Sequence, residues 1–589
     1  MKMLVFLCPR VVAIGLLAVC LVLAPSAQAQ SQNLYDWAWV SRLGPTALPG
    51  QNSPVPPAFG GNSEKLAADA AGNVVIAGVY HTDFIFDNPA VRYQAVTGPL
   101  GPVANGYVAK YSPAGALVWS LDLRSNADVG VRDLALDAAG NSYVVGSYYQ
   151  QLHLNATLVA VSSTSLPFFL AKISPAGNLL WAITIESSAP VTRFSLQRLA
   201  VDAAGNSAVL GEFEHQVSIN GATFTGAASK LHALVLRYDA LGTATRSFAA
   251  YTTGAESSRS FTGIALAATG ECYLSGDVAS AATIQFGSLP LITGPAPVGN
   301  RSYSRAFVAK LDATATAEWV LTSSGPAGTG QGVGHVVAGP QGRCYAVGFF
   351  GGGAMTLGPQ ALSTAGTGSQ ADIFYARLAP SGAVELLVGG GGTAKVTGLA
   401  LSTQGEATIA TAGGMSWGNV QLPGAVWPAS FLTGLVQLDA AGVSQRGWQA
   451  GVGFFAPTLA VDGLNRPVLA GTYDGPSPFV FGTQQRASPY AWNTLIARTA
   501  GTVLAARPAA PVVGLEMYPN PARHVVEVRT PTGAAAVVQL FDALGRSIHT
   551  QVLSAGQTQV DLAGVAPGSY TLRVQQGEGR SYRHVVVAP

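Results

Sequence analysis

The sequence predicts an all-β protein, a seven-bladed β-propeller followed by a small C-terminal β-sandwich. Three observations predict this fold class: a short hairpin motif recurs along the chain, a lone strand near the N-terminus resembles the end of a repeat, and the last segment has a different strand pattern. The composition agrees with it, because only 11% of the 589 residues are charged while 70 are Gly and 35 are Pro. Many short strands joined by turns have such a composition.

Residues 1–29 have the features of a secretory signal peptide. Lys2 is followed by an apolar run over 11–24, and the small residues of "SAQA" end at Ala29, where a signal peptidase can cut. A membrane anchor is the alternative, but the apolar run is short for a bilayer span. The formal net charge of +2 includes Lys2 and Arg10, so the mature chain is near neutral and has no charge pattern for nucleic acid or anionic membranes.

The repeated motif is a β-hairpin of the form "LALDAAGNSYVVG", which here spans 134–146. Its turn carries a Gly or Asn that can adopt the left-handed conformation needed to reverse the chain. This turn residue recurs in seven units, at Gly72, Gly140, Gly205, Gly270, Gly342, Gly405 and Asn465.

An Asp stands three residues before the turn residue in four units, at Asp69, Asp137, Asp202 and Asp462. Its carboxylate can accept backbone N–H bonds across the turn. Calcium binding is the alternative interpretation, but each loop offers a single carboxylate, and a calcium site needs several oxygen ligands. The sequence therefore favours a structural turn without a metal.

A second hairpin follows in each unit, as in "YVAKYSPAGALVWSLDL" at 107–123 and "FLAKISPAGNLLWAITI" at 169–185. Each unit thus contains four strands, which is the pattern of a propeller blade of about 40–50 residues lengthened here by inserts. The inserts lie between the second and third strands, as at 87–105.

The seventh unit lacks a fourth strand, and residues 36–43 supply a candidate for it. "DWAWVSRLG" resembles "LVWSLDL" and has no first three strands of its own. We expect this segment to complete the last blade and close the ring over residues 30–500, because closure removes an exposed sheet edge. The pattern D-x-x-G-N-x-x-x-x-G followed by F-V-A-K, G and W resembles the bacterial β-propeller repeat family known as SBBP. That resemblance implies the fold and no activity.

An Ala/Pro-rich linker at 501–513 precedes a tail of residues 514–589. The motifs "YPNPA", "DALGR" and "PGSYTLRV" occur there in that order, and the tail resembles the C-terminal sorting domain of type IX secretion substrates. The resemblance implies a β-sandwich that engages the type IX secretion machinery. It also implies export through the periplasm to the outer cell surface or the medium. The alternative is a carbohydrate-binding sandwich.

No catalytic, cofactor-binding or metal-binding residue can be assigned. The sequence contains no HExxH, P-loop or CxxC motif. Loop histidines such as His81 and His215 are more often solvated than catalytic. Cys272 and Cys344 occupy equivalent places in two repeats and are expected to be small buried residues.

Two residue patterns leave a choice between structure and binding. Aromatic side chains follow the second strands, and they are expected to fill the space between blades, with sugar stacking as the alternative. Basic residues recur on the third strands and are expected to face solvent, with a cationic ring for an anionic polymer as the alternative. The aromatic positions are Tyr80, Tyr148, Phe213, Phe350 and Tyr473, and the basic ones are Lys110, Lys172, Arg237, Lys310, Arg377 and Arg498.

Two functions compete. The first is a non-catalytic binding or adhesion module for a glycan or a protein, which rests on a rigid scaffold with variable inserts. The second is an extracellular polysaccharide lyase or hydrolase with its site at the channel mouth. Neither requires a cofactor, a nucleic acid or a transmembrane segment in the mature chain.

Overall fold

The structure is a computed structural model, and its residues fall into two compact units, Met1–Gly501 and Thr502–Pro589. The predicted signal peptide and the linker at 501–513 lie outside the described residues. The residues described are 37–45, 64–87, 90–98, 101–162, 167–191, 193–254, 261–299, 301–364, 371–392, 395–422, 433–450, 454–474, 479–481, 484–486, 492–500, 515–529, 535–541, 547–576 and 579–588.

The protein is all-β, as predicted. The described part of the first unit contains seven antiparallel sheets with the same four-stranded core. The four core strands of a sheet pair in chain order, with insert strands left out of the count, and only the sheet that contains β1 departs from this order. Sheet 1 is β2 (Lys65–Ala68), β3 (Val74–Tyr80), β8 (Asn105–Tyr111) and β9 (Leu117–Arg124); sheet 2 is β10 (Gly130–Leu136), β11 (Ser142–Ser147), β14 (Phe168–Ile173) and β15 (Leu179–Ile185); sheet 3 is β16 (Arg193–Val201), β17 (Ser207–Glu214), β20 (Leu231–Tyr238) and β21 (Ala244–Gly254); sheet 4 is β22 (Phe261–Leu266), β23 (Cys272–Ala279), β26 (Ser304–Leu311) and β27 (Ala317–Ser324).

The remaining three sheets follow the same plan. Sheet 5 is β28 (Gln331–Ala338), β29 (Cys344–Phe350), β32 (Asp372–Leu378) and β33 (Val384–Gly392); sheet 6 is β34 (Lys395–Leu401), β35 (Ala407–Ala412), β38 (Thr433–Leu438) and β39 (Ser444–Gln449); sheet 7 is β40 (Phe454–Val461), β41 (Pro467–Asp474), β44 (Trp492–Thr499) and β1 (Trp37–Pro45). The fourth strand of sheet 7 therefore comes from the N-terminal side of the chain, and β1 pairs antiparallel with β44 from Trp37 to Leu43.

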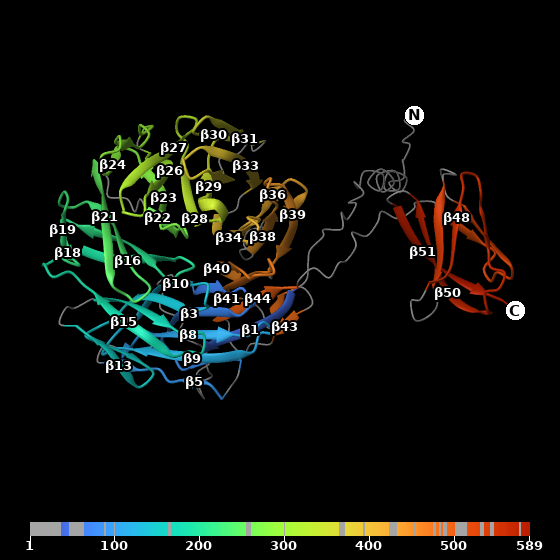
Figure 1. The fold of residues 1–589 in the computed structure, drawn as a ribbon, viewed down its shortest axis with the longest axis horizontal. Helices are drawn as coiled ribbons and strands as arrows, with labels where there is room; N and C mark the ends of the chain where they lie inside the picture. Colours follow the sequence, from blue (N-terminus) through green and yellow to red (C-terminus); the bar gives the residue numbers. More distant parts are fainter. Residues whose placement is uncertain are drawn as a thin grey trace, which may run out of the picture. The chain divides into compact units, whose positions relative to one another are not determined.

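The first strands of the sheets lie innermost and face a common centre (Figure 1). Each contacts the first strand of the next sheet, and β40 contacts β2. Hydrophobic clusters fill the spaces between successive sheets, and one joins Val468 and Ile496 of sheet 7 to Ile76 and Tyr107 of sheet 1. Second and third strands are buried on both faces as a result, and β8, β11 and β14 contain only buried residues.

The inserts between second and third strands form short hairpins. In five sheets the first strand of the insert pairs with the fourth strand of the preceding sheet and covers its outer edge. These hairpins are β4 (Phe84–Ile85) with β5 (Arg92–Tyr93), β12 (Gln151–Leu154) with β13 (Thr157–Val161), β24 (Ala282–Phe286) with β25 (Ile292–Thr293), β30 (Ala354–Leu357) with β31 (Gln360–Ser363), and β36 (Met415–Trp417) with β37 (Val420–Leu422). The other short hairpins are β6 (Thr97–Gly98) with β7 (Gly101–Pro102), β18 (Gln216–Ile219) with β19 (Ala222–Thr225), and β42 (Phe479–Phe481) with β43 (Gln484–Arg486).

The second unit holds two antiparallel sheets around one core that includes Val526, Leu540 and Leu572. The "DALGR" segment at 542–546 lies outside the described residues. One sheet is β45 (Glu516–Tyr518), β46 (Val525–Arg529) and β49 (Gln559–Asp561), and the other is β48 (Ser547–Leu553), β47 (Ala536–Phe541), β50 (Gly568–Gln576) and β51 (Gly579–Val587). The described part of the chain holds no helix with the length and apolarity that a bilayer crossing requires.

Candidate functional site

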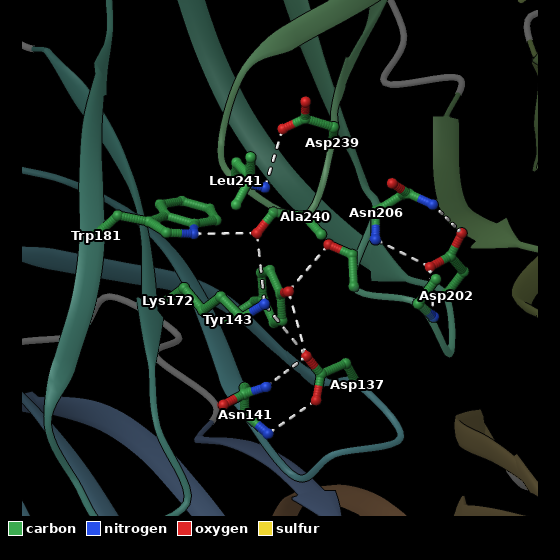
Figure 2. A network of polar contacts seen from close by, with 12 residues as sticks. Asp137, Asn141, Tyr143, Lys172, Trp181, Asp202, Asn206, Asp239, Ala240 and Leu241 are labelled. Carbon is green, nitrogen blue, oxygen red and sulfur yellow. Dashed lines mark hydrogen bonds and ion pairs between the residues drawn. The ribbon is translucent and has the colours of Figure 1, made fainter.

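Five of the six basic residues of the third strands are buried at the junctions between sheets, and Arg377 is half-buried there, so the predicted solvent-facing position is wrong. The Nζ atom of Lys172, on β14, lies 3.4 Å from the Oδ2 atom of Asp137 in the same sheet. Its ammonium also donates to the carbonyl of Ala240 in the next sheet, at 3.4 Å. Trp181, directly opposite Lys172 on β15, donates its indole N–H to the same carbonyl at 3.2 Å. Figure 2 shows the lysine and the tryptophan converging on Ala240. A strand stacked between two sheets has no solvent face, so the cation pairs locally instead.

The same junction bond recurs at every step around the seven sheets. A side chain from the third or fourth strand of one sheet donates to a turn carbonyl of the next sheet. The donors and acceptors are Trp119 and Pro175, Trp181 and Ala240, Arg237 and Ala313, Trp319 and Pro380, Arg377 and Ala440, Gln437 and Asn465, and Trp39 and Pro113. These repeated cations are structural, and they do not form a ring open to an anionic polymer.

The Asp turns use both carboxylate oxygens within the turn. In Asp137 one oxygen accepts the backbone N–H of Asn141 at 2.9 Å, and the other accepts the side-chain amide of Asn141 at 2.7 Å. Asp69 and Asp202 bind Asn73 and Asn206 in the same way. The predicted acceptance of backbone N–H groups by the Asp carboxylate is confirmed. The Asn that follows the turn Gly adds a second hydrogen bond, from its side-chain amide to the other carboxylate oxygen. Among the described residues, no group of acidic, His or Cys side chains is arranged to hold a metal ion.

The recurring aromatic side chains are buried, so the predicted space-filling role is confirmed and sugar stacking on them is wrong. Tyr148, Phe213 and Phe350 have no exposed surface. His232 is buried as well, and its ring nitrogens are used by the Thr252 N–H and the Ala227 carbonyl, each at 3.0 Å. Cys272 and Cys344 are free and buried, as expected.

A cavity of about 580 Å³ lies where the first strands face one another. Its polar lining comes from separate strands, with Lys65 on β2, Asp133 on β10, Arg198 on β16, His335 on β28 and Lys395 on β34. Leu66, Val396, Pro457 and Leu459 provide an apolar wall, and Thr397 and Thr458 add hydroxyls.

A β-bulge precedes three of the polar cavity residues, Asp133, Arg198 and His335. Each first strand has an apolar residue that recurs in every repeat, such as Leu134 in β10. In six first strands the pairing register shifts just before the residue that precedes this apolar residue. A bulge redirects the side chain of the residue that comes after the shift. The shifts precede Asp133, Arg198, Gly263, His335, Gly398 and Thr458.

The electrostatics of the cavity favour negative charge. Burial and the cations Arg198 and Lys65 lower the pKa of His335 to about 4, so its imidazole is neutral at neutral pH. Burial also lowers the pKa of Lys65 and raises the pKa of Asp133. The Asp133 carboxylate accepts the backbone N–H groups of Leu134 at 3.0 Å and of Leu199 at 2.8 Å. Arg198 donates its Nε–H to the Thr262 carbonyl at 3.1 Å. The site can therefore hold an anion, and its neutral imidazole can donate or accept one hydrogen bond.

This cluster was not predicted from the sequence, although the sequence carries a signal for it. The position before the apolar residue of each first strand varies while the rest of the motif repeats: it is Lys65, Asp133, Arg198, Gly263, His335, Gly398 and Thr458 in the seven units. Variation at one place in an otherwise regular repeat indicates a position that the scaffold does not fix.

The C-terminal tail matches a known family. Residues 516–588 match the model of the secretion system C-terminal sorting domain, which confirms the resemblance of the tail. The chain is therefore secreted through the periplasm to the outer cell surface or the extracellular space. No curated protein matches the chain.

Solved structures match at low similarity. A protein of unknown function from Bacteroides caccae is 13% identical with a TM-score of 0.30, and the match covers 58% of this chain and 89% of that one. A protein of unknown function from Dyadobacter fermentans is 10% identical with a TM-score of 0.30, over 74% and 95% of the two chains. A puromycin hydrolase mutant is 11% identical with a TM-score of 0.37, over 85% and 62%. These scores are too low to support an argument about function.

Proposed function

We propose that the seven sheets are the blades of a seven-bladed β-propeller over residues 30–500, and that residues 514–589 form a separate β-sandwich. The recurring junction bond supports this proposal, because it links each sheet to the next and sheet 7 back to sheet 1. The innermost position of the first strands and the resemblance of the repeats to the SBBP family support it as well.

We propose further that this exported protein is a non-catalytic binding module for an extracellular glycan or protein. One observation carries the proposal: the polar residues that repeat are used in the junctions, whereas those that vary gather around the central cavity. A rigid scaffold that varies in one concave, charged place is typical of a recognition site. Five of the seven inserts cover sheet edges, so the cavity is a better candidate for recognition than those inserts.

A lyase is the second candidate, because His335 and Asp133 share the cavity with Lys65 and Arg198. In an elimination, a base removes the proton beside the carboxylate of an acidic sugar while the glycosidic C–O bond breaks and a C=C bond forms. The neutral imidazole of His335 would be the base, Arg198 would hold the carboxylate, and the oxygen of the broken bond would leave with a proton taken from solvent. A hydrolase fits less well, since hydrolysis of a glycosidic bond usually needs two carboxyl groups, and Asp133 is the only one in the described lining.

Two assays on the purified chain test the proposal. A glycan array measures binding, and polysaccharide digestion followed by ultraviolet absorbance and chromatography measures turnover. We expect retention of a defined set of glycans with no new products. Formation of unsaturated oligosaccharides would contradict the binding proposal and support the lyase, and loss of that activity in His335→Ala would place it in the cavity.

A further inference from the structure

We propose that the central cavity binds an acidic sugar through its carboxylate or sulfate group, an inference that rests on the binding function proposed above. The lining joins three basic side chains to one carboxylate: Lys65, Arg198 and Lys395 face Asp133. Three cations and one anion leave an excess of positive charge next to a neutral imidazole.

The single carboxylate is already committed to the scaffold. Both oxygens of Asp133 accept backbone N–H groups, and the bond to Leu199 crosses from β10 to β16 at 2.8 Å. Asp133 is therefore poorly placed to turn toward Arg198 and Lys395. A ligand that brings its own oxyanion can pair with these two side chains.

The guanidinium of Arg198 is held in place for such a ligand. Its Nε–H donates to the Thr262 carbonyl at 3.1 Å, and one terminal nitrogen donates to the Gln197 carbonyl at 3.3 Å. These bonds use two of the five N–H donors that an arginine side chain carries. An arginine fixed in this way can present its remaining donors to a carboxylate or sulfate without a further loss of side-chain freedom.

The size and lining of the cavity favour a sugar unit over a folded protein. An open cavity of about 580 Å³ bordered by the first strands admits a small molecule or the end of a chain. The described residues of the lining include no aromatic side chain on which a neutral sugar ring could stack. Among these residues the charged groups offer the basis for selectivity, while Thr397 and Thr458 offer hydroxyls to the sugar.

Calorimetric titration of the full chain tests the inference, with glucuronate, glucose 6-sulfate and glucose as probes. We expect the two acidic sugars to bind and glucose to bind at least tenfold more weakly, and their relative affinities identify which oxyanion the site prefers. Because a charged hydrogen bond contributes substantially, Arg198→Gln should weaken acidic-sugar binding by about tenfold or more.

Two further variants and a control test whether acidic-sugar affinity falls when a positive charge is removed and rises when the negative charge is removed. Lys395 is exposed, so Lys395→Gln should weaken binding several-fold without changing the melting temperature. Asp133→Asn should strengthen binding, because it removes the one carboxylate of the described lining, and the melting temperature measures the cost of the backbone bond that the new amide nitrogen cannot accept. Arg193→Gln removes an exposed cation from the same strand as Arg198 and should have no effect.

Three results would overturn the inference: glucose binding as tightly as glucuronate, unchanged affinity in both Arg198→Gln and Lys395→Gln, or binding of an acidic peptide in place of the sugars. A neutral glycan or a protein whose binding ignores these variants would leave the binding function intact and remove only the acidic specificity. Turnover of an acidic polysaccharide, with a KM that Arg198→Gln raises, would remove the non-catalytic binding function and keep the acidic specificity of the cavity.

Discussion

Gly177 meets two separate requirements at one junction. Its φ is +85°, in the left-handed region that other residues rarely adopt, and a Cβ at this position would lie 2.9 Å from the Cδ2 atom of Trp119 in the preceding sheet. Gly115 and Gly382 have the same relation to Trp39 and Trp319. The repeated Gly and Trp are thus two halves of one contact between neighbouring sheets.

A comparison of Gly177→Ala with Gly221→Ala separates the two requirements. Gly221 has a φ of +77° but nothing within 4 Å of a built Cβ, so its substitution should cost only the backbone strain, about 1–2 kcal/mol. Gly177→Ala should cost about 1–3 kcal/mol more, because the methyl group displaces the indole. Chemical denaturation of each variant measures the difference. Equal costs would show that the indole contact is unimportant.

Asp277 on β23 makes stability depend on pH. Burial raises the pKa of Asp277 to about 6, above the value of 3.8 for a free aspartate. The folded state therefore holds this proton over a pH range in which the unfolded chain releases it, and the free energy of unfolding falls as the pH rises from about 4 to about 6.

We expect Asp277→Asn to stabilise the protein at pH 7 by about 1–2 kcal/mol, after allowance for the partial exposure of the side chain. The gain should vanish below about pH 4, where both states are protonated. Thermal unfolding of the two chains at a series of pH values measures it. A gain that is the same at every pH would show that ionisation is not its cause.

At the residue scale, local chemistry was predictable and contacts across junctions were not. The Asp–Gly turn follows from the sequence of a single hairpin, because its bonds lie within five residues. Lys172 bonds to Ala240 in the next sheet, and nothing in either segment alone indicates that pairing. The cavity residues have the same difficulty, since they lie close together only when their strands share one axis.

At the element scale, the outer edges of the sheets are covered by two means. The N-terminal strand β1 completes sheet 7, and five insert hairpins extend the preceding sheets. The repeat predicts where the inserts lie. It does not predict their partners, because edge pairing depends on backbone groups that every sequence carries. Unpaired strand edges promote association with other chains.

Deletion of residues 30–44 should severely lower the melting temperature and cause concentration-dependent association, because it leaves β44 as an open edge. It also removes the bond from Trp39 to the Pro113 carbonyl. Deletion of residues 30–36 alone keeps β1 and is the matched control. Calorimetry and light scattering measure both effects, and an unchanged melting temperature in the longer deletion would contradict the role of β1.

At the scale of the whole molecule, the two units have separate tasks. The first holds the cavity, and residues 516–588 match a sorting domain. Each unit has its own hydrophobic core among the described residues. The order of the tail motifs was enough to identify the tail from the sequence, whereas the ligand of the cavity depends on side chains that the linear sequence scatters over separate repeats.

A chain that ends at residue 510 should fold and accumulate in the periplasm of a host with type IX secretion, because it lacks the sorting domain. Fractionation and surface immunolabelling compare it with the full chain expressed at the same level. Efficient delivery of the truncated chain to the surface would contradict the assignment of the tail.

The pairing of β1 with β44 also constrains the order of events during synthesis. The ribosome makes β1 before the other strands, yet its partner is made near the end of the first unit, and the Thr494 hydroxyl bonds to Glu64 across 430 residues. A nascent chain therefore carries a largely apolar strand whose pairing partner is absent until nearly the whole first unit has been translated. Any factor that holds this chain unfolded before export must protect that strand for the longest time.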